Sequence, residues 1–153
     1  NTTQSRDGVV KSTGISQCLL EKAAEPLVSL PDNFILHPLV SKAIKKRGDA
    51  LAKTGSGRVD WATAELLALS SLALEGIKVR LSGHDSQRRN FSQRHAVWHD
   101  FSTGSKHKAM PTLCEVINSP LSELSTVGFE FGWSLNNRDS LVLWEAQFGD
   151  FSN

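Results

Sequence analysis

Residues 62–74 restrict the fold of this 153-residue chain more than any other segment. They are rich in Ala and Leu, and their apolar side chains go nearly all the way round a helix. Asp60 is placed to cap the start of this helix, and Gly76 follows its end. A helix without a polar side must be covered by other elements. The chain is long enough to form one domain with such a core.

Short apolar runs alternate with helical patterns around this segment. Strands are predicted at 77–81, 112–117 and 141–144. Further helices are predicted at 14–24, 38–52 and 119–134. Ser119 and Pro120 are expected to open the last helix as its cap and first-turn residue. This alternation indicates an α/β fold with the strands in one sheet. The polar segment 82–105 is expected to be a long functional loop.

The chain divides into three parts by composition. Residues 1–13 carry few large apolar groups and are expected to be a poorly ordered lead-in. Residues 14–57 form a helical connecting segment that ends in a Gly-Ser-Gly linker at 53–57. Residues 58–153 contain the buried helix and all the predicted strands.

Several side chains can be assigned to surface or core from their type. The basic run 45–47 is expected to form a solvated helix face. Cys18 and Cys114 are expected to pack as small hydrophobic residues, and nothing in their spacing indicates a disulfide scaffold. The four tryptophans are expected to fill the core or an interface: Trp61, Trp98, Trp133 and Trp144.

Composition excludes several classes of partner. The formal net charge is +1 and 22% of residues are charged, so no strong field favours nucleic acid or an anionic membrane. No apolar run approaches the roughly 18 residues that span a bilayer. The widely spaced cysteines fit a reducing compartment. The chain begins Asn-Thr-Thr, so no signal peptide is visible, and a targeting peptide would lie upstream.

The segment 144–151, Trp-Glu-Ala-Gln-Phe-Gly-Asp-Phe, follows directly on the predicted last strand. It places acidic and amide groups among aromatic rings at the carboxyl end of that strand. Ligands bind at this edge in open α/β sheets. An ordinary loop after a strand would explain the same composition, and composition alone leaves the two interpretations open.

Further segments give this stretch a context. Four segments come before it in this order: 59–65 (Val-Asp-Trp-Ala-Thr-Ala-Glu), 80–83 (Arg-Leu-Ser-Gly), 91–95 (Phe-Ser-Gln-Arg-His) and 119–123 (Ser-Pro-Leu-Ser-Glu). In this order they resemble the first, decarboxylating component of 2-oxoglutarate dehydrogenases, or its 2-oxoadipate homologue, which use thiamin diphosphate. The resemblance implies that 58–153 is the N-terminal part of a transketolase-like pyrimidine-binding domain, a partial thiamin-diphosphate-binding fold with a helical lead-in.

The resemblance assigns Glu123 a catalytic and cofactor-binding role. The family's Ser-Glu at this place supplies the carboxylate that hydrogen-bonds the aminopyrimidine ring of thiamin diphosphate. The pattern alone favours a simpler interpretation, a Glu stabilised in the first turn by the helix dipole. Phe148, and after it Phe151, match the aromatic rings that related enzymes place against the pyrimidine.

The loop after the first strand carries the remaining candidates. By resemblance, His95 is catalytic and acts on substrate or intermediate. Arg88, Arg94 and His99 are candidates for binding the anionic substrate, because guanidinium and imidazolium groups suit carboxylates. His95 and His99 are also four residues apart, a weak signal for zinc without a third ligand, so no metal site is expected within the chain.

The same loop departs from the family pattern at two positions. The family reads Gly-Thr where this chain has Arg89 and Asn90. Glycine permits backbone angles that Arg adopts only at a cost, so the loop is expected to be reshaped.

The family's magnesium and diphosphate site lies on a partner domain with a Gly-Asp-Gly motif, which is absent from these 153 residues. The resemblance therefore implies that this chain holds only the pyrimidine half of the cofactor. It further implies a homodimer, a lipoyl-bearing acyltransferase as partner, and a place in the mitochondrial matrix of a eukaryote or the cytoplasm of a bacterium. The alternative is a non-catalytic relative or truncated fragment that serves as an interaction or regulatory subunit.

Overall fold

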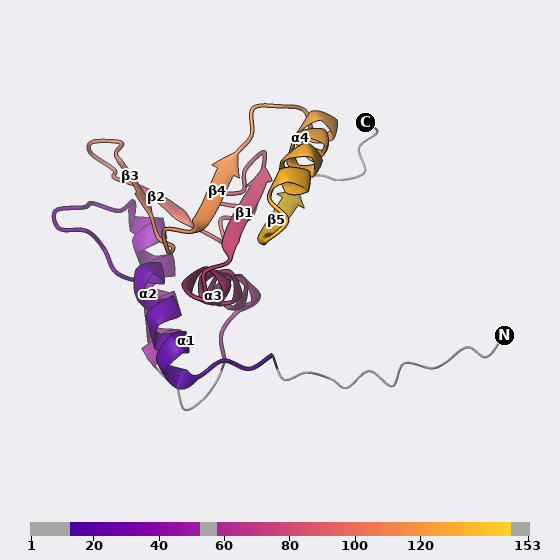
Figure 1. Ribbon diagram of the computed structural model, residues 1–153. Coiled ribbons are helices and arrows are strands. Elements are labelled where there is room, and N and C mark those ends of the chain that lie inside the picture. Colours follow the sequence, from indigo (N-terminus) through magenta and orange to yellow (C-terminus); the bar gives the residue numbers. More distant parts are fainter. Residues whose placement is uncertain (1–12, 53–57, 148–153) are drawn as a thin grey trace.

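The computed structural model describes residues 13–52 and 58–147. Figure 1 shows its elements, which in chain order are α1 (Gln17–Ala24), a 3-10 turn (Glu25–Leu27), α2 (Pro38–Ala52), α3 (Trp61–Leu74), β1 (Lys78–Gly83), β2 (Val97–His99), β3 (Lys106–Lys108), β4 (Cys114–Asn118), α4 (Glu123–Asn136) and β5 (Ser140–Glu145). The α/β prediction is confirmed. The expected linker at 53–57 and nearly all of the lead-in lie outside the described residues, and the division of the chain into three parts stays a prediction.

The three predicted strands form one parallel sheet in the order β4-β1-β5. Gly83 at the end of β1 is aligned with Asn118 of β4 and Glu145 of β5. The carboxyl ends of all three strands therefore meet at one edge, which is the edge where α/β sheets bind ligands. The strand order reverses at β1: β4 lies on one side of it, and β5 lies on the other side after a crossover through α4.

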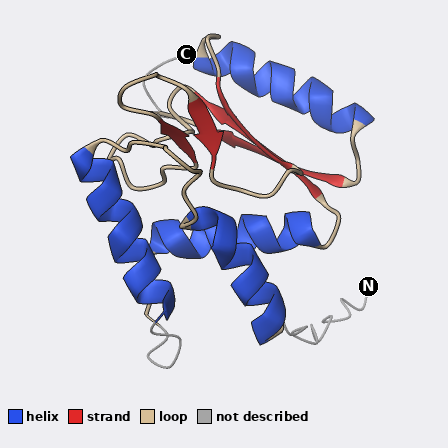
Figure 2. Ribbon diagram, turned by 90° about the vertical axis from the view of Figure 1, so that its left-hand side faces the viewer, coloured by secondary structure: helices blue, strands red, loops and turns tan. Residues whose placement is uncertain are grey.

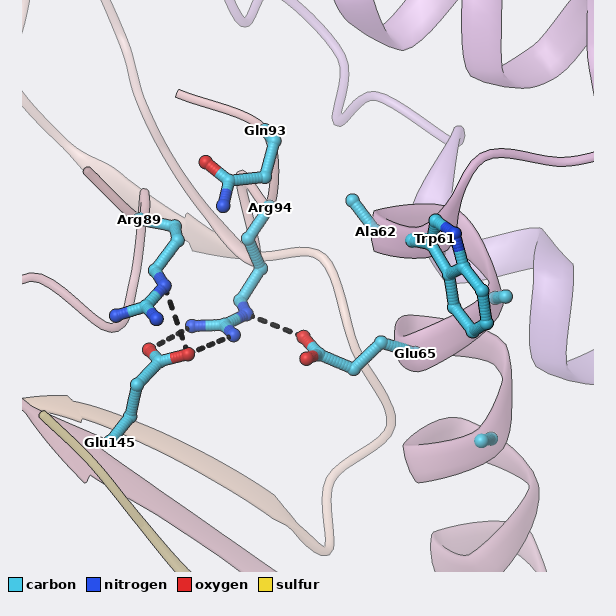
Figure 3. A pocket seen from close by; sticks show the side chains of 9 residues that line it. Trp61, Ala62, Glu65, Arg89, Gln93, Arg94 and Glu145 are labelled. Atoms are coloured by element: carbon cyan, nitrogen blue, oxygen red, sulfur yellow. Dashed lines mark hydrogen bonds and ion pairs between the residues drawn. The ribbon is translucent and has the colours of Figure 1, made fainter. Parts of the chain in front are cut away.

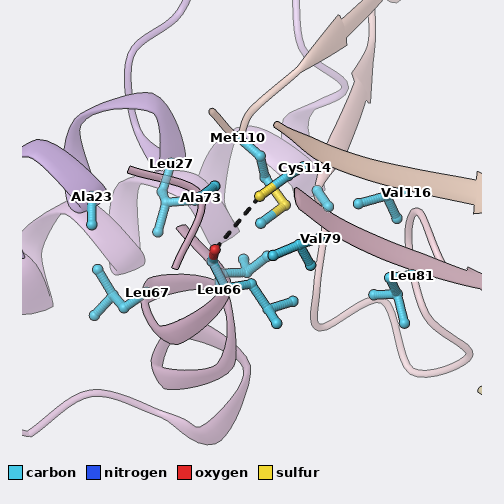
Figure 4. Packing of buried hydrophobic residues seen from close by; sticks show 12 residues of the cluster. Ala23, Leu27, Leu66, Leu67, Ala73, Val79, Leu81, Met110, Cys114 and Val116 are labelled. Atoms are coloured by element: carbon cyan, nitrogen blue, oxygen red, sulfur yellow. Dashed lines mark hydrogen bonds between the residues drawn. The ribbon is translucent and has the colours of Figure 1, made fainter. Parts of the chain in front are cut away.

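Helices cover both faces of this sheet (Figure 2), with α3 on one face and α4 on the other. The face toward α3 is apolar. Val79 and Leu81 of β1 pack there with Leu66 of α3, which is fully buried, and Figure 4 shows this cluster. Each fully buried side chain of this size contributes about 1.5–3 kcal/mol. Cys114 belongs to the same cluster, as expected of a packed hydrophobic residue.

The face toward α4 is held by charges. Arg80 of β1 donates to both carboxylate oxygens of Glu130, at 2.7 and 2.9 Å, and Glu130 is buried. The Arg80 guanidinium also lies 5.1 Å from the ring centre of Trp133. These hydrogen bonds and the pairing with Glu115 hold the pKa of Arg80 above its ordinary value. Alternation along β1 thus separates an apolar face from an ionic one.

The start and end of α3 follow the prediction. The Asp60 carboxylate accepts a hydrogen bond from the Thr63 amide at 2.8 Å, and Gly76 adopts a φ of 90° just after the helix. The core position expected for Trp61 is wrong, because its side chain is 92% exposed, and an interface position stays a prediction. It stands at the first position of α3. Helix α1 packs along α3 and completes its cover.

Three other expectations are wrong. Helix α4 is capped by Ser122, whose hydroxyl accepts from the Ser125 amide, while the Ser119 hydroxyl pairs with Thr126 instead. Segment 82–105 is not wholly irregular, because β2 lies within it and pairs antiparallel with β3. Cys18 is exposed rather than packed.

The basic run 45–47 is only partly solvated. Lys45 and Lys46 are exposed, whereas Arg47 is buried and donates to the carbonyl oxygens of Leu27 and Arg94. Burial lowers the pKa of Arg47, and Asp60 opposes that shift. Among the residues that the structure describes, no helix combines the length and apolar character needed to cross a membrane.

Candidate functional site

The loop that follows β1 folds back on itself at the carboxyl edge of the sheet. The Arg89 amide donates to the Asp85 carbonyl at 2.7 Å, and the Ala96 amide donates to that of Gln87 at 2.8 Å. Arg89, Ser92 and His95 all adopt positive φ angles, of 69°, 52° and 45°. Residues other than glycine are uncommon in this region, and clusters of them mark sites where the surroundings hold the backbone.

A cavity of about 380 Å³ brings three of the predicted site residues together. Arg88, His95 and His99 all line it, and the strand-end residue Asn118 contributes to its wall. The remaining lining includes an aromatic side and two acidic residues: His37, Val40, Asp85, Gln87, Val97, Trp98, Asp100 and Phe101. The cavity therefore combines titratable groups with an apolar wall, as small-molecule sites do.

His95 is the buried titratable group of this cavity. Burial lowers the pKa of His95, a hydrogen bond with the Ser92 backbone opposes the shift, and the positive Arg47 and Arg88 add to it. The imidazole is thus neutral near pH 7, the form that accepts a proton. His99 lies on β2 and is exposed.

Arg88 is half-exposed and already bonded within the loop. Its guanidinium donates to Asp85 at 2.6 Å and to the Ser92 hydroxyl at 2.8 Å. Asp100 also lines the cavity and carries a negative charge. Backbone hydrogen bonds from Ile35 and Thr103 keep the pKa of Asp100 well below its usual range.

Arg94 lies elsewhere, in a larger cavity of about 530 Å³ between α3 and the sheet (Figure 3). Its side chain is buried and donates to both oxygens of Glu145, at 2.5 and 2.6 Å, to Glu65 at 2.7 Å and to the Ser86 carbonyl. Burial acts to lower the pKa of Arg94, and the bonds to the two carboxylates outweigh burial and raise it. The guanidinium is committed to these partners, which makes it a positioning group in this arrangement.

The larger cavity is the weaker candidate for chemistry. Its two carboxylates are paired with its two arginines, since Glu145 also bonds Arg89 at 3.0 Å and Glu65 bonds Arg94. The smaller cavity holds the neutral imidazole and lies against the end of β4. We therefore place the candidate site at the smaller cavity and the neighbouring strand ends.

Glu123 opens α4 at the same edge of the sheet. Ser122 caps the helix, so the Glu123 carboxylate stands in the first turn, where the helix dipole favours negative charge. One carboxylate oxygen accepts a hydrogen bond of 2.7 Å from the amide of Gln147, the second residue after β5. Glu123 is half-buried and is not among the residues lining the cavity of His95. Phe148 and Phe151 lie outside the described residues.

Two residues that depart from the family pattern tie the loop to the end of β5. Arg89 donates to the carbonyl oxygen of Ala146 at 3.0 Å, and Asn90 donates to that of Gln147 at 3.0 Å. No pattern in the sequence indicates these contacts or the pairing of Arg94 with Glu145. Such pairs join segments more than fifty residues apart, and no local pattern encodes them.

Within residues 13–52 and 58–147, no group of three or more His, Cys, Asp or Glu side chains could hold a metal ion. The i,i+4 pair His95 and His99 is not on a helix: the first lies in the loop and the second on β2.

Comparison with known proteins gives a family. Residues 57–153 match the family described as "Transketolase, pyrimidine binding domain". The chain is 47% identical to "2-oxoglutarate dehydrogenase, mitochondrial" of Dictyostelium discoideum, over 92% of this chain and 15% of that protein. It is 43% identical to "2-oxoglutarate dehydrogenase E1 component" of Bacillus mycoides (strain KBAB4), over 92% and 15%. It is 42% identical to "Multifunctional 2-oxoglutarate metabolism enzyme" of Mycobacterium sp. (strain JLS), over 93% and 12%.

The resemblance found in the sequence is thereby confirmed. The chain spans only 12–15% of the length of these curated relatives. Its parallel sheet and covering helices agree with the matched domain. The chain therefore belongs to the family of transketolase pyrimidine-binding domains, in the form that 2-oxoglutarate dehydrogenase E1 components carry.

Proposed function

We propose that this chain forms part of a thiamin-diphosphate-dependent dehydrogenase that decarboxylates 2-oxoglutarate or its homologue 2-oxoadipate. The acyl group then passes to a lipoyl-bearing acyltransferase. Residues 58–153 contribute the N-terminal part of the pyrimidine-binding domain and hold the pyrimidine half of the cofactor. Identity of 42–47% over nine-tenths of the chain supports this proposal. The family match over residues 57–153 includes the loop, α4 and the end of β5.

One observation carries the proposal: the carboxylate of Glu123 lies at the carboxyl edge of the sheet and is held there by the Gln147 amide. A carboxyl group held at this edge could hydrogen-bond a ring nitrogen of the aminopyrimidine and exchange a proton with it. Thiamin diphosphate supplies the electron sink for decarboxylation when it is bound. The helix dipole and the Gln147 bond keep the carboxylate oriented before the cofactor arrives.

The neighbouring cavity supplies groups for the substrate. His95 is buried and neutral near pH 7, so it can move a proton at the reacting end of a 2-oxo acid. Arg88 and His99 line the same cavity and suit a substrate carboxylate. Arg94 contributes indirectly, since it holds Glu145 at the end of β5. Phe148 and Phe151 remain the candidates for the apolar wall against the pyrimidine.

The remaining parts of the proposal follow from the family. Magnesium would be held by a domain with the Gly-Asp-Gly motif, and two subunits would pair to complete each site. The enzyme would work in the mitochondrial matrix of a eukaryote or the cytoplasm of a bacterium. A non-catalytic interaction subunit is not favoured, because the chain keeps both the strand-end carboxylate and the buried histidine.

The test compares Glu123→Gln with wild type in the longest form of the protein that its gene encodes. Exchange of the cofactor's thiazolium C2 proton, measured with thiamin diphosphate and magnesium, should slow roughly 100-fold or more in the variant. Glu75→Gln is the control, because Glu75 is exposed just before β1 at the opposite edge of the sheet. Equal exchange rates in wild type and Glu123→Gln would reduce Glu123 to a helix-end charge.

A further inference from the structure

We propose that Arg89 and Asn90 are positioning residues that lock the segment after β5 and, through it, orient the Glu123 carboxylate. The inference rests on the proposed function of Glu123 and adds a cause for its orientation. It assigns a task to the two positions at which this chain departs from the Gly-Thr pattern of its family.

The backbone of Arg89 supplies the first argument. Its φ of 69° lies in the left-handed region that favours glycine, so arginine is strained there. A residue retained under strain requires a compensating role for its side chain. The guanidinium provides one, because it bonds Glu145 at 3.0 Å and donates to the carbonyl oxygen of Ala146 at 3.0 Å.

Asn90 extends the same contact by one residue. Its amide nitrogen donates to the carbonyl oxygen of Gln147 at 3.0 Å. The side chains of Arg89 and Asn90 therefore hydrogen-bond two successive carbonyl groups, those of Ala146 and Gln147. The amide oxygen of Asn90 is buried and has no hydrogen-bond partner within the described part of the chain.

Gln147 connects this lock to the carboxylate. While its carbonyl accepts from Asn90, its amide donates to Glu123 at 2.7 Å. Fixing the backbone of Gln147 fixes the direction of that N–H, and hence the rotamer in which the carboxylate is held. Gln147 thereby joins the loop that carries His95 to the helix that begins with Glu123.

The variants Arg89→Gly and Asn90→Ala, alone and combined, test the lock. Glycine adopts the φ of position 89 without strain, so Arg89→Gly removes the side chain and should retain the fold. Arg138→Ala is the matched control, because Arg138 is exposed in the turn between α4 and β5, away from the carboxyl edge. All four variants are compared with wild type as the 153-residue chain.

The first readout is hydrogen exchange at the Gln147 amide, followed by NMR. Each hydrogen bond contributes about 0.5–1.5 kcal/mol, so each single variant should exchange roughly 3- to 10-fold faster and the double variant faster still. Arg138→Ala should exchange like wild type. A wild-type exchange rate in the double variant would overturn the lock, whatever the protein does with a cofactor.

The second readout is C2-proton exchange of thiamin diphosphate in the longest form of the protein, at saturating cofactor and with melting temperatures measured in parallel. The double variant should slow this exchange by about tenfold without a matching loss of stability. Faster Gln147 exchange with wild-type C2 exchange would overturn the link to Glu123. No acceleration of C2 exchange by the wild-type protein would refute the proposed function, and the Gln147 measurement would still decide the lock.

Discussion

Replacing Arg94 with methionine should strongly destabilise the chain. The Arg94 side chain is only 4% exposed and joins β5 to α3 through Glu145 and Glu65. Methionine keeps the unbranched apolar stem and removes the charge. Removing one partner of a buried ion pair costs about 3–5 kcal/mol, because the other charge stays buried. Glu145 is 16% exposed and keeps Arg89 at 3.0 Å, so we expect the lower end, about 3 kcal/mol.

The same guanidinium offers an internal comparison. Glu65 is 45% exposed, so solvent screens its pairing with Arg94, and Glu65→Gln should cost less than about 1 kcal/mol. Glu145→Gln should lie between the two, since it removes the bidentate bond and leaves both arginines without a carboxylate there. The expected order of losses is therefore Arg94→Met, then Glu145→Gln, then Glu65→Gln.

Urea unfolding of the 153-residue chain measures these losses through the midpoint at constant slope. For a chain of this size, a loss of 3 kcal/mol corresponds to a fall in melting temperature of roughly 6–12 °C. Arg94→Met within 1 kcal/mol of wild type would refute the reasoning. An equal loss of unfolding free energy in Glu65→Gln and Arg94→Met would also refute it, because solvent exposure would then not weaken the ion pair.

Three further outcomes follow from the structure. Gly83→Ala should lower the free energy of unfolding in urea by about 1–3 kcal/mol, because a Cβ there would clash with the Glu145 carbonyl oxygen and push β5 away from β1. Wild-type stability of this variant would contradict the packing. Burial lowers the pKa of His95, so the unfolded chain binds the proton more tightly than the folded chain does. The free energy of unfolding should therefore be highest above pH 7 and decline as the pH falls through about 6.5. The decline should be shallower in His95→Gln, and equal slopes in the two proteins would contradict this role of His95. Burial raises the pKa of Cys114 to about 11, whereas Cys18 is exposed. Iodoacetamide at pH 8 should therefore label Cys18 at once and Cys114 only as the chain unfolds. Equal labelling of the two thiols, measured by mass spectrometry, would contradict the fold.

Much of the fold could be predicted from the sequence because its signals are local. The helix 38–52 and the capped start of α3 follow from periodicity and from Asp60. The sequence does not predict the hairpin of β2 and β3, because each strand is only three residues long and β3 is entirely polar. Burial of Arg47 was missed because its acceptors, the carbonyls of Leu27 and Arg94, come from distant segments.

The candidate site was predictable to a smaller extent. A Glu in the first turn of a helix is ordinary, and only the family resemblance singled out Glu123. The catalytic role of His95 likewise came from the resemblance, and the structure adds the burial and the cavity of its imidazole. The bonds from Arg89 and Asn90 to the end of β5 are long-range, and they depend on a backbone angle at Arg89 that its residue type disfavours.

The strand order also determines when the sheet can form during synthesis. Val79 in the central strand is paired with Cys114 on one side and Leu141 on the other, and both residues are synthesised after it. Until then the apolar face of β1 is covered by α3, the helix synthesised just before it. Non-local pairings of this kind fold slowly and expose strand edges meanwhile. The nascent chain is therefore most prone to aggregation between the emergence of β1 and that of β5.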